Sequence, residues 1–447
     1  YAITWYNFLF YYFYSAILNL LGAHGERILL VARLVTLALA AFGAIGHRLV
    51  IRRVAGRGGP LFEFAASALV AVSWFGTNYT AWWAFSIRPD VGGAALVTWG
   101  LLAYLRAADR RSAWGMAAAS ILFLAAWAFK QSLVWVLFSV SLYTLVRPRD
   151  WRLLLPLTLP CAAGMAATIA CLGPTYWQNT VAVQTTAAME LRHGARIFAR
   201  IFLQNAFCWI YPFVPLVLGR AMRAGGESGA ATEARPRGNG ALWLALAITF
   251  AYGFSALCHA GSNKNHIIEY YIITTTLALA ALRRVLDGPP GRPRAIGVAA
   301  AAALIAPMAA FPAAQLAAPR SFGRIRLADA AEYAGRTSLA GAVDGLEKPV
   351  LVFDDILCQP WHATGDRYPA FVPDMNWYWV GKAQGLFEGG GADELIRRHE
   401  FRSLVLADWM AGEMKAARES GYCEVEPPRG IRDAGFKLLV PCGPGPP

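Results

Sequence analysis

The sequence lacks the short motifs that mark the commonest classes of soluble enzyme. It contains no P-loop, no G-x-G-x-x-G, no H-E-x-x-H and no cysteine–histidine spacing typical of a zinc site. Charged residues are also scarce, at 15% of 447 residues, whereas a soluble domain usually carries about 25%. Nucleotide-phosphate and zinc-site signatures are therefore absent, and the low charge argues against a purely soluble protein.

Apolar residues make up 57% of the chain, and its mean hydropathy is +0.40. This composition predicts a polytopic α-helical membrane protein. The 16 Trp and 17 Tyr suit the two bilayer interfaces. About ten or eleven apolar helices are expected, at 4–21, 28–49, 62–82, 90–107, 113–129, 131–146, 153–172, 204–220, 241–259, 266–283 and 295–318.

The pattern changes after Pro319. Short apolar runs at 348–355 and 402–408 predict buried strands, and the segments 392–400 and 411–421 predict helices. We therefore expect two domains, a multi-spanning transmembrane domain over 1–318 and a soluble extracytoplasmic α/β domain over 319–447.

The charges divide in the same way. Residues 1–319 carry a net charge of +16 and residues 320–447 a net charge of −3, so the basic balance belongs to the membrane part and does not indicate nucleic-acid binding. Five loops hold 18 of the 26 basic residues of residues 1–319, and the positive-inside rule places them in the cytoplasm. They contain Arg48, Arg52, Arg53, Arg57; Arg106, Arg110, Arg111; Arg147, Arg149, Arg152; Arg220, Arg223, Arg235, Arg237; and Arg283, Arg284, Arg292, Arg294.

This loop order places three polar motifs and the C-terminal domain together on the extracytoplasmic face. The motifs are RPD (88–90), KQS (130–132) and GSNKNH (261–266). The segment 4–21 then either starts in the cytoplasm or lies as a re-entrant or interfacial helix, and the loop charges do not decide between these.

The seven cysteines form no metal pattern. Cys161, Cys171, Cys208 and Cys258 lie in apolar segments and are expected as small core residues. Cys358, Cys423 and Cys442 lie in the polar tail. One disulfide is expected there, with Cys423–Cys442 the preferred pair.

The RPD and KQS motifs each have two interpretations. Pro89 suits a first helical turn, and Asp90 is either a capping residue beside an interfacial Arg88 or a carboxylate that binds a metal, a sugar hydroxyl or a catalytic partner. Lys130 and Gln131 interrupt a run of apolar residues and would sit at the tip of a helical hairpin over 113–146. Lys130 is either a snorkelling lysine or a ligand for a phosphate oxygen.

The third motif opens a helix with polar residues. Asn265, His266 and Glu269 share one helical face, and Glu269 lies about one turn into the membrane. The alternatives are a solvated helix start and the wall of a polar cleft, and the cost of an unpaired carboxylate near lipid favours the cleft.

Two further segments carry charge with less specific signals. In the loop 173–202, Arg192, Arg196 and Arg200 recur every four residues beside Ile197 and Phe198, which predicts an amphipathic helix on the membrane. Such a helix could contact acidic lipid headgroups, and generic interfacial packing is the alternative. Asp354 and Asp355 follow a predicted strand in the tail, where they are expected to cap a turn.

The order of these motifs resembles that of the polytopic GT-C glycosyltransferases. FYYFYSAILNLLG, RPDVGGAALVTWGLLAYLRA, FKQSLVWVLFSVSLYTLV and GSNKNHIIEYY occur in turn, followed by a soluble tail. The pattern is most similar to bacterial members related to protein O-mannosyltransferases and to the lipid A aminoarabinose transferase.

The resemblance implies an inverting transfer of a hexose or pentose in a bacterial inner membrane. The donor would be a polyprenyl-phosphate-linked sugar, and the acceptor a lipid, glycan or protein on the extracytoplasmic face. It also implies a catalytic Asp or Glu in the first extracytoplasmic loop, ahead of a segment like 6–22. Because the sequence begins at Tyr1 without an initiator Met, we expect an N-terminally incomplete chain with that residue upstream.

The resemblance also suggests roles for the polar motifs. Lys130 is the first candidate for the donor phosphate, with Arg88 and Lys264 behind it and Gln131 beside it. Asp90 would bind the sugar or a divalent metal, which is the one cofactor considered. Asn265, His266 and Glu269 would line the cleft.

Two other functions remain open. A transporter or flippase would show charged or helix-breaking positions near the bilayer midplane and two matching halves, whereas here the ionisable residues gather at one face and no repeat is visible. An O-antigen ligase or polymerase also acts on lipid-linked sugars, and only the tail and the motif order argue against it.

Overall fold

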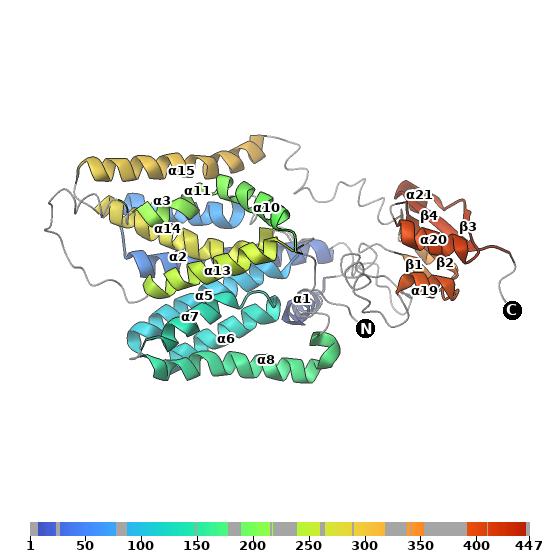
Figure 1. The fold of residues 1–447 in the computed structure, drawn as a ribbon, viewed down its shortest axis with the longest axis horizontal. Coiled ribbons are helices and arrows are strands. Elements are labelled where there is room, and N and C mark those ends of the chain that lie inside the picture. The colour runs from blue at the N-terminus through green and yellow to red at the C-terminus, as the bar shows by residue number, and fades with distance from the viewer. Residues whose placement is uncertain are drawn as a thin grey trace.

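A computed structural model describes most of the chain. It covers residues 8–23, 27–76, 87–147, 150–177, 189–214, 217, 239–259, 264–287, 290–317, 338–339, 341–352, 391–408 and 410–443. In Figure 1 the long helices form one body and the strands belong to a second, smaller one.

The larger body is built of helices. Five are long and apolar enough to cross a membrane, namely Leu30–Ala55, Pro89–Arg110, Trp151–Pro174, Gly240–Leu257 and Arg292–Ala310. The helices are α1 (Phe8–Leu20), α2 (Arg27–Ala55), α3 (Pro60–Ala71), α5 (Pro89–Arg110), α6 (Ala113–Phe129), α7 (Trp135–Leu145), α8 (Leu154–Trp177), α10 (Leu191–Gln204), α11 (Ala206–Ile210), α13 (Asn239–Leu257), α14 (Ile268–Asp287) and α15 (Arg292–Ala317).

Four short elements complete this part. A π-helix, η1 (Val72–Gly76), continues α3, and three 3₁₀ turns, η2 (Trp151–Leu153), η4 (Tyr211–Phe213) and η5 (Lys264–Ile267), precede or follow longer helices. Each apolar run expected from the sequence contains a helix within its described residues, so the predicted polytopic helical fold is confirmed. The run 204–220 is divided between α11 and η4, with Pro212 in η4.

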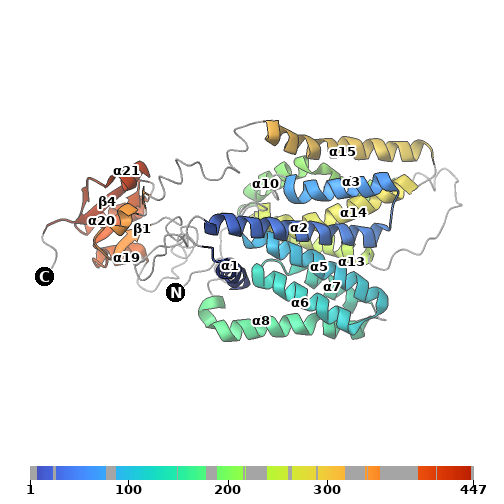
Figure 2. The ribbon, with the colours of Figure 1, turned by 180° about the vertical axis from the view of Figure 1, so that it is seen from behind.

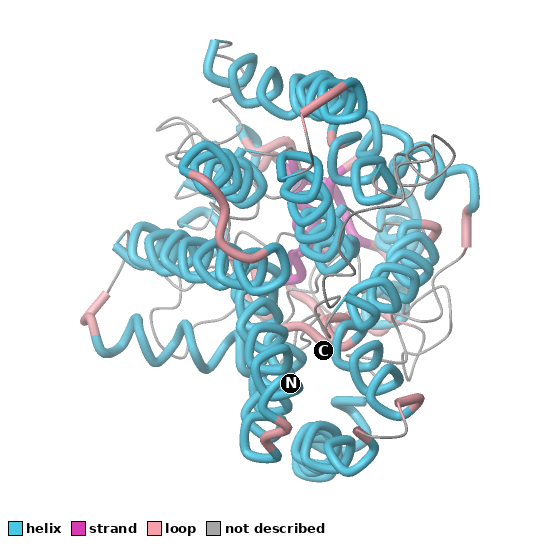
Figure 3. The backbone as a smooth tube through the Cα atoms, turned by 90° about the vertical axis from the view of Figure 1, so that its left-hand side faces the viewer, coloured by secondary structure: helices cyan, strands magenta, loops and turns pink. Residues whose placement is uncertain are grey.

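Helices α5 and α14 form the centre of the bundle, whereas α8 and α15 lie at its edge. In the most apolar 18-residue stretch of α5, 72% of the residues are buried inside the protein, whereas the corresponding share is 17% in α8 and in α15. Figure 1 shows α15 and α8 along opposite margins, and the reverse view shows α2 and α3 on the other face (Figure 2). Several helices are seen nearly end-on in Figure 3. The apolar surfaces of α8 and α15 are therefore left for lipid.

Basic loops meet at one end of the bundle, which we call the basic end. Arg53 pairs with Asp109, Arg111 lies 3.9 Å from Asp150, and Arg283 donates to the carbonyl oxygen of Arg57 at 3.0 Å. These contacts join four of the five loops that charge counting grouped together. The fifth, at 220–237, lies outside the described residues.

The smaller body contains a four-stranded sheet in the order β1-β2-β4-β3. Strand β1 (Val350–Val352) is parallel to β2 (Ser403–Ala407), whereas β4 (Phe436–Pro441) is antiparallel to both β2 and β3 (Tyr422–Val425). The segments 348–355 and 402–408 were expected as strands, and β1 and β2 lie within them. The boundary expected at 318–319 involves residues outside the described part, so the domain division stays a prediction.

Helices cover both faces of this sheet because successive strand residues point to opposite sides. Leu404 and Leu406 pack with α19 (Ala392–Arg397) and α20 (Ala411–Glu419), as predicted from the segments 392–400 and 411–421. Val405 packs on the other face with Leu339 and with Ile431 of α21 (Arg429–Asp433). The result is a three-layer α/β arrangement.

A disulfide links Cys423 of β3 to Cys442, which follows β4. The pairing preferred from the sequence is therefore confirmed. Of the other described cysteines, Cys161, Cys208 and Cys258 are buried and Cys171 is exposed, so the expected core role is wrong for Cys171.

Candidate functional site

Asp90 lies in the first turn of α5. The helix begins with Pro89 after an extended, half-buried Arg88, and Pro is favoured at this position because the first amides of a helix have no intrahelical partner. The Asp90 side chain is fully buried and forms an ion pair with Lys130. The N-cap residue Arg88 makes no side-chain cap bond, while Asp90 lies in the first turn, where its charge complements the helix dipole.

Lys130 reaches Asp90 from the end of α6. Its backbone is extended, with φ −149° and ψ 118°, and a turn over 130–134 leads into α7. The predicted order of two helices joined by a turn with Lys130 and Gln131 is present, but α6 packs mainly on α5 and α8, and α7 mainly on α13. The lysine does not snorkel, because its side chain is only 6% exposed and is held by Asp90. Gln131 is half-buried in the turn.

Two glycines allow α5 and α6 to approach closely at this point. A Cβ on Gly93 would lie 2.2 Å from Leu133 and 3.3 Å from the carbonyl oxygen of Ala126, and one on Gly92 would lie 2.6 Å from Phe129. The contacts of 2.2 and 2.6 Å are too short for a carbon atom, so a larger residue at either glycine would displace Leu133 or Phe129 beside Lys130.

Glu269 lies in the first turn of α14 and is also buried, with 3% of its surface exposed. Its carboxylate accepts a hydrogen bond from the backbone N–H of Val136 at 3.2 Å, in the first turn of α7. An acidic group at a helix N-terminus satisfies an orphan amide and complements the helix dipole. Glu269 therefore caps α7 across the bundle, and the interpretation as a solvated helix start is wrong.

His266 completes a cluster formed by four elements of the bundle. It precedes Glu269 in η5, is half-buried, and its Nδ1 has no hydrogen-bond partner within the described part of the chain. Lys130 lies close enough to His266 and Glu269, and Asp90 close enough to His266, for their charges to interact. Among the described residues, the carboxylate bonded to Lys130 is that of Asp90.

The ammonium group retains hydrogen-bonding capacity. A lysine has three N–H donors, and Asp90 Oδ1 is the acceptor bonded to it among the residues that the structure describes. Asp90 can therefore orient Lys130 while two N–H groups remain for the oxygens of a ligand. A phosphate would suit them, because its charge matches the ammonium.

The structure does not describe the side chains of the remaining predicted site residues. Lys264 and Asn265 belong to η5, but their side chains lie outside the described part of the structure. Asp354 and Asp355 of the tail also lie outside it. Among the described residues, no three His, Cys, Asp or Glu side chains are placed to hold a metal. A metal ligand role for Asp90 stays a prediction, and we derive no chemical step through a metal.

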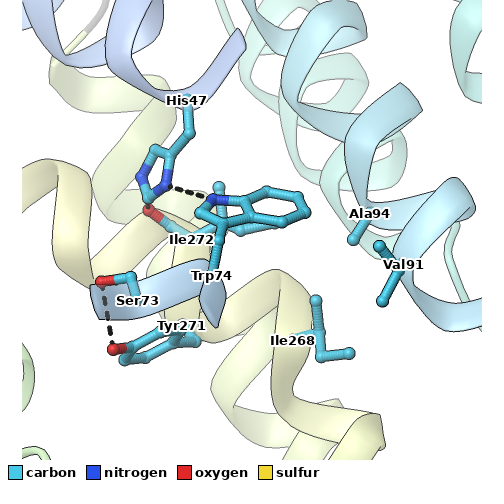
Figure 4. A pocket seen from close by; sticks show the side chains of 8 residues that line it. All are labelled: His47, Ser73, Trp74, Val91, Ala94, Ile268, Tyr271 and Ile272. Atoms are coloured by element: carbon cyan, nitrogen blue, oxygen red, sulfur yellow. Dashed lines mark hydrogen bonds between the residues drawn. The ribbon is translucent and has the colours of Figure 1, made fainter. Parts of the chain in front are cut away.

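Sequence reasoning missed an interior hydrogen-bond network directly behind this cluster. His47 of α2 accepts from the indole N–H of Trp74 at 3.2 Å through Nδ1 (Figure 4). Its Nε2 lies 3.1 Å from both Ile272 O and Thr276 Oγ1. Because Nδ1 is the acceptor, the ring proton is on Nε2. The available signal was a single histidine inside the apolar run 28–49.

The cavity beside His47 is too small to be a substrate site. It measures about 20 Å³, and Val91 and Ile268, the sequence neighbours of Asp90 and Glu269, help to line it. That volume accommodates roughly one water molecule. The network therefore supports the packing of α2, η1 and α14 beneath the cluster, and a sugar does not fit there.

The comparisons with known proteins place the fold. No protein-family model and no curated protein sequence matches the chain. Among solved structures, the chain is similar to the crystal structure of ArnT from Cupriavidus metallidurans bound to undecaprenyl phosphate. The TM-score is 0.55 at 16% identity, over 98% of this chain and 89% of that one. At this identity the likeness shows a shared fold, so the chain has the GT-C-like polytopic fold of ArnT.

Proposed function

We propose that this protein is a membrane glycosyltransferase that takes a sugar from a polyprenyl-phosphate-linked donor and transfers it to an acceptor on the extracytoplasmic face. The first support is the shared fold with a solved protein bound to undecaprenyl phosphate. The acceptor would be a lipid, a glycan or a protein.

The observation that carries the proposal is the buried Asp90–Lys130 ion pair at the end of the bundle away from the basic end. When the sugar leaves, the polyprenyl phosphate takes up negative charge, and a fixed cation stabilises that charge. In our proposal Asp90 holds Lys130 towards the phosphate. Arg88 and Lys264 would add positive charge to the phosphate site, with Gln131 beside Lys130.

Residues of the third motif would face the sugar. Asn265 and His266 would offer it polar groups, and Glu269 holds the start of α7 by accepting from Val136. Deprotonation of an acceptor hydroxyl needs a carboxylate base. We assign that role to no residue of this chain, because Asp90 and Glu269 are already engaged with Lys130 and Val136.

The position of the charges favours an enzyme over a transporter or flippase. Asp90 and Glu269 lie in the first turns of their helices and Lys130 directly follows α6, whereas transporters place such groups near the bilayer midplane. A ligase or polymerase that acts on lipid-linked glycans would use the same phosphate chemistry and stays the alternative.

The sidedness in this proposal can be measured with the cysteines of the C-terminal domain. The positive-inside rule puts the basic end in the cytoplasm, and a disulfide is typical of an oxidising compartment. In intact cells, we expect Cys423 and Cys442 to react with a membrane-impermeant maleimide once an impermeant reductant is added. A Trp114→Cys variant, at an exposed position on the basic side, should react only after permeabilisation. Tail cysteines that require permeabilisation would contradict the proposed orientation.

Donor turnover tests the proposed reaction. Membranes that contain the protein would receive a panel of polyprenyl-phosphate hexoses and pentoses, and free polyprenyl phosphate would be quantified by mass spectrometry. We expect time-dependent release of polyprenyl phosphate from at least one donor, with the sugar recovered on an acceptor. Movement of the intact donor across the membrane without cleavage would indicate a flippase and contradict the proposal.

A further inference from the structure

Helix α10 has a fixed orientation on the bundle. Gly194 packs against the end of α13, where a Cβ would lie 2.4 Å from Cys258 Sγ and 3.0 Å from its Cα. Ile201 is fully buried, and the Phe198 ring meets the rings of Trp209 and Phe250 at 5.2 and 5.5 Å. One face of α10 therefore packs against the protein interior.

The opposite face carries a row of arginines. Arg192, Arg196 and Arg200 are spaced by four residues, so they follow one another along the helix, and all three are exposed. None of them takes part in an ion pair among the described residues. Like charges at this spacing destabilise a helix unless an external anion compensates them. The row therefore lacks a counter-charge within the described part of the protein.

Both ends of α10 lie at the end of the bundle opposite the basic end. At its start, the backbone N–H of Glu190 donates to Cys258 O, just beyond the span that α13 provides. After its last residue, Asn205 lies 3.5 Å from the hydroxyl of Tyr271, near the start of α14. The helix therefore lies at this end of the bundle (Figure 1). Helices that cross the bilayer would reach the headgroup layer at this level.

Exposed apolar side chains accompany the arginines. Met189, Leu191 and Leu203 are 62%, 68% and 70% exposed. A helix with arginines and exposed apolar groups at the level where spans end fits the interfacial class, whose basic face contacts anionic lipids. An acidic peptide would compensate the charge but would leave these apolar groups without a partner.

We propose that the outer face of α10 binds the anionic phosphate headgroups of membrane lipids. Arg192, Arg196 and Arg200 contact the phosphates, while Leu191 and Leu203 enter the acyl boundary. The proposal does not rest on the glycosyltransferase function, because it concerns a surface and no reaction. It gives the arginine row the counter-charge that the described protein does not provide.

A fluorophore on α10 can report which lipids lie beside it. Ala199 is exposed between Arg196 and Arg200, so an Ala199→Cys label would sit on the arginine face, in a background with Cys171→Ala and Cys358→Ser. The labelled full chain would be placed in nanodiscs with equal fractions of brominated phosphatidylglycerol or brominated phosphatidylcholine. We expect quenching by brominated phosphatidylglycerol to be about fivefold greater than quenching by brominated phosphatidylcholine. A preference of this size corresponds to the attraction of one arginine to an anionic surface.

Variants separate the arginine row from general charge effects. Arg192→Gln, Arg196→Gln and Arg200→Gln together should bring the quenching ratio to about one, whereas the three Lys substitutions should retain the preference because the charge persists. The matched control removes Arg106, Arg110 and Arg292, which are exposed towards the basic end, and should leave the ratio unchanged.

Three results would overturn the proposal. One is equal quenching of the unmodified arginine face by both lipids. A second is loss of the preference in the control variant as well as in the α10 variant. The third is loss of the lipid contact when an acidic peptide is added at low concentration, which would assign the surface to a protein partner.

Discussion

Replacing Lys130 by Met is expected to lower the free energy of unfolding by about 3–5 kcal/mol, because it leaves the Asp90 carboxylate buried without a counter-charge. Asp90 is fully buried, so water cannot take the place of the ammonium group. Met fills much of the volume of the lysine stem, and the loss therefore reports the charge more than the packing. Unfolding of the detergent-solubilised protein measures it.

Two further variants test whether the loss of stability comes from the unpaired charge and from its burial. Asp90→Leu combined with Lys130→Met removes both charges and should recover most of the lost stability, because apolar residues of similar volume often replace a buried ion pair without cost. Lys415→Met breaks the exposed pair with Glu419, at 3.7 Å, and should cost less than about 1 kcal/mol. Although stable, the double variant should bind polyprenyl phosphate more weakly than the unmodified protein does. Normal phosphate binding by that variant would show that the pair is only structural.

Replacing Glu269 by Ala is expected to cost about 2–3 kcal/mol, since a buried amide loses a charged acceptor. The Val136 N–H would have no partner to replace the carboxylate, and the start of α7 would lose the negative charge that its dipole favours. Amide exchange at Val136 should accelerate together with the loss of stability. Hydrogen exchange and unfolding of the same sample measure the two effects.

The isosteric variant is the control for this prediction. Glu269→Gln keeps an oxygen acceptor for Val136, so its cost should be about 1 kcal/mol and the exchange rate at Val136 should change little. Equal losses in the Ala and Gln variants would show that the negative charge, and not the hydrogen bond, holds α7. An unchanged exchange rate at Val136 in the Ala variant would contradict the capping role.

The helical part of the fold could be predicted because membrane spans are long and their composition differs from that of loops. Loop charges placed the RPD, KQS and GSNKNH motifs at one end, and the contacts of Asp90 with Lys130 and of Glu269 with Val136 bring elements of all three together. Strands β3 and β4 were missed. They are only four and six residues long, and their sequences, YCEV and FKLLVP, do not alternate polar and apolar residues, so the strand signal is weak.

The Asp90–Lys130 ion pair was not predicted from the sequence. Asp90 and Lys130 are 40 positions apart, and each was assigned a ligand of its own. The two glycines after Asp90 were the available clue, because adjacent small residues near a helix start permit close helix contact. Glu269 lies buried in the first turn of α14, within the apolar run expected at 266–283. Its partner is a backbone amide, which no side-chain motif reveals.

The location of a bound polyprenyl phosphate tests the central claim most directly. A photoactivatable undecaprenyl phosphate analogue, with the reactive group next to the phosphate, would be crosslinked to the protein, and the labelled residues would be identified by mass spectrometry. The account predicts labelling near Lys130 and in the segment 264–269, which undecaprenyl phosphate suppresses and undecaprenol does not. Labelling confined to the basic end, or equal competition by undecaprenol, would contradict it.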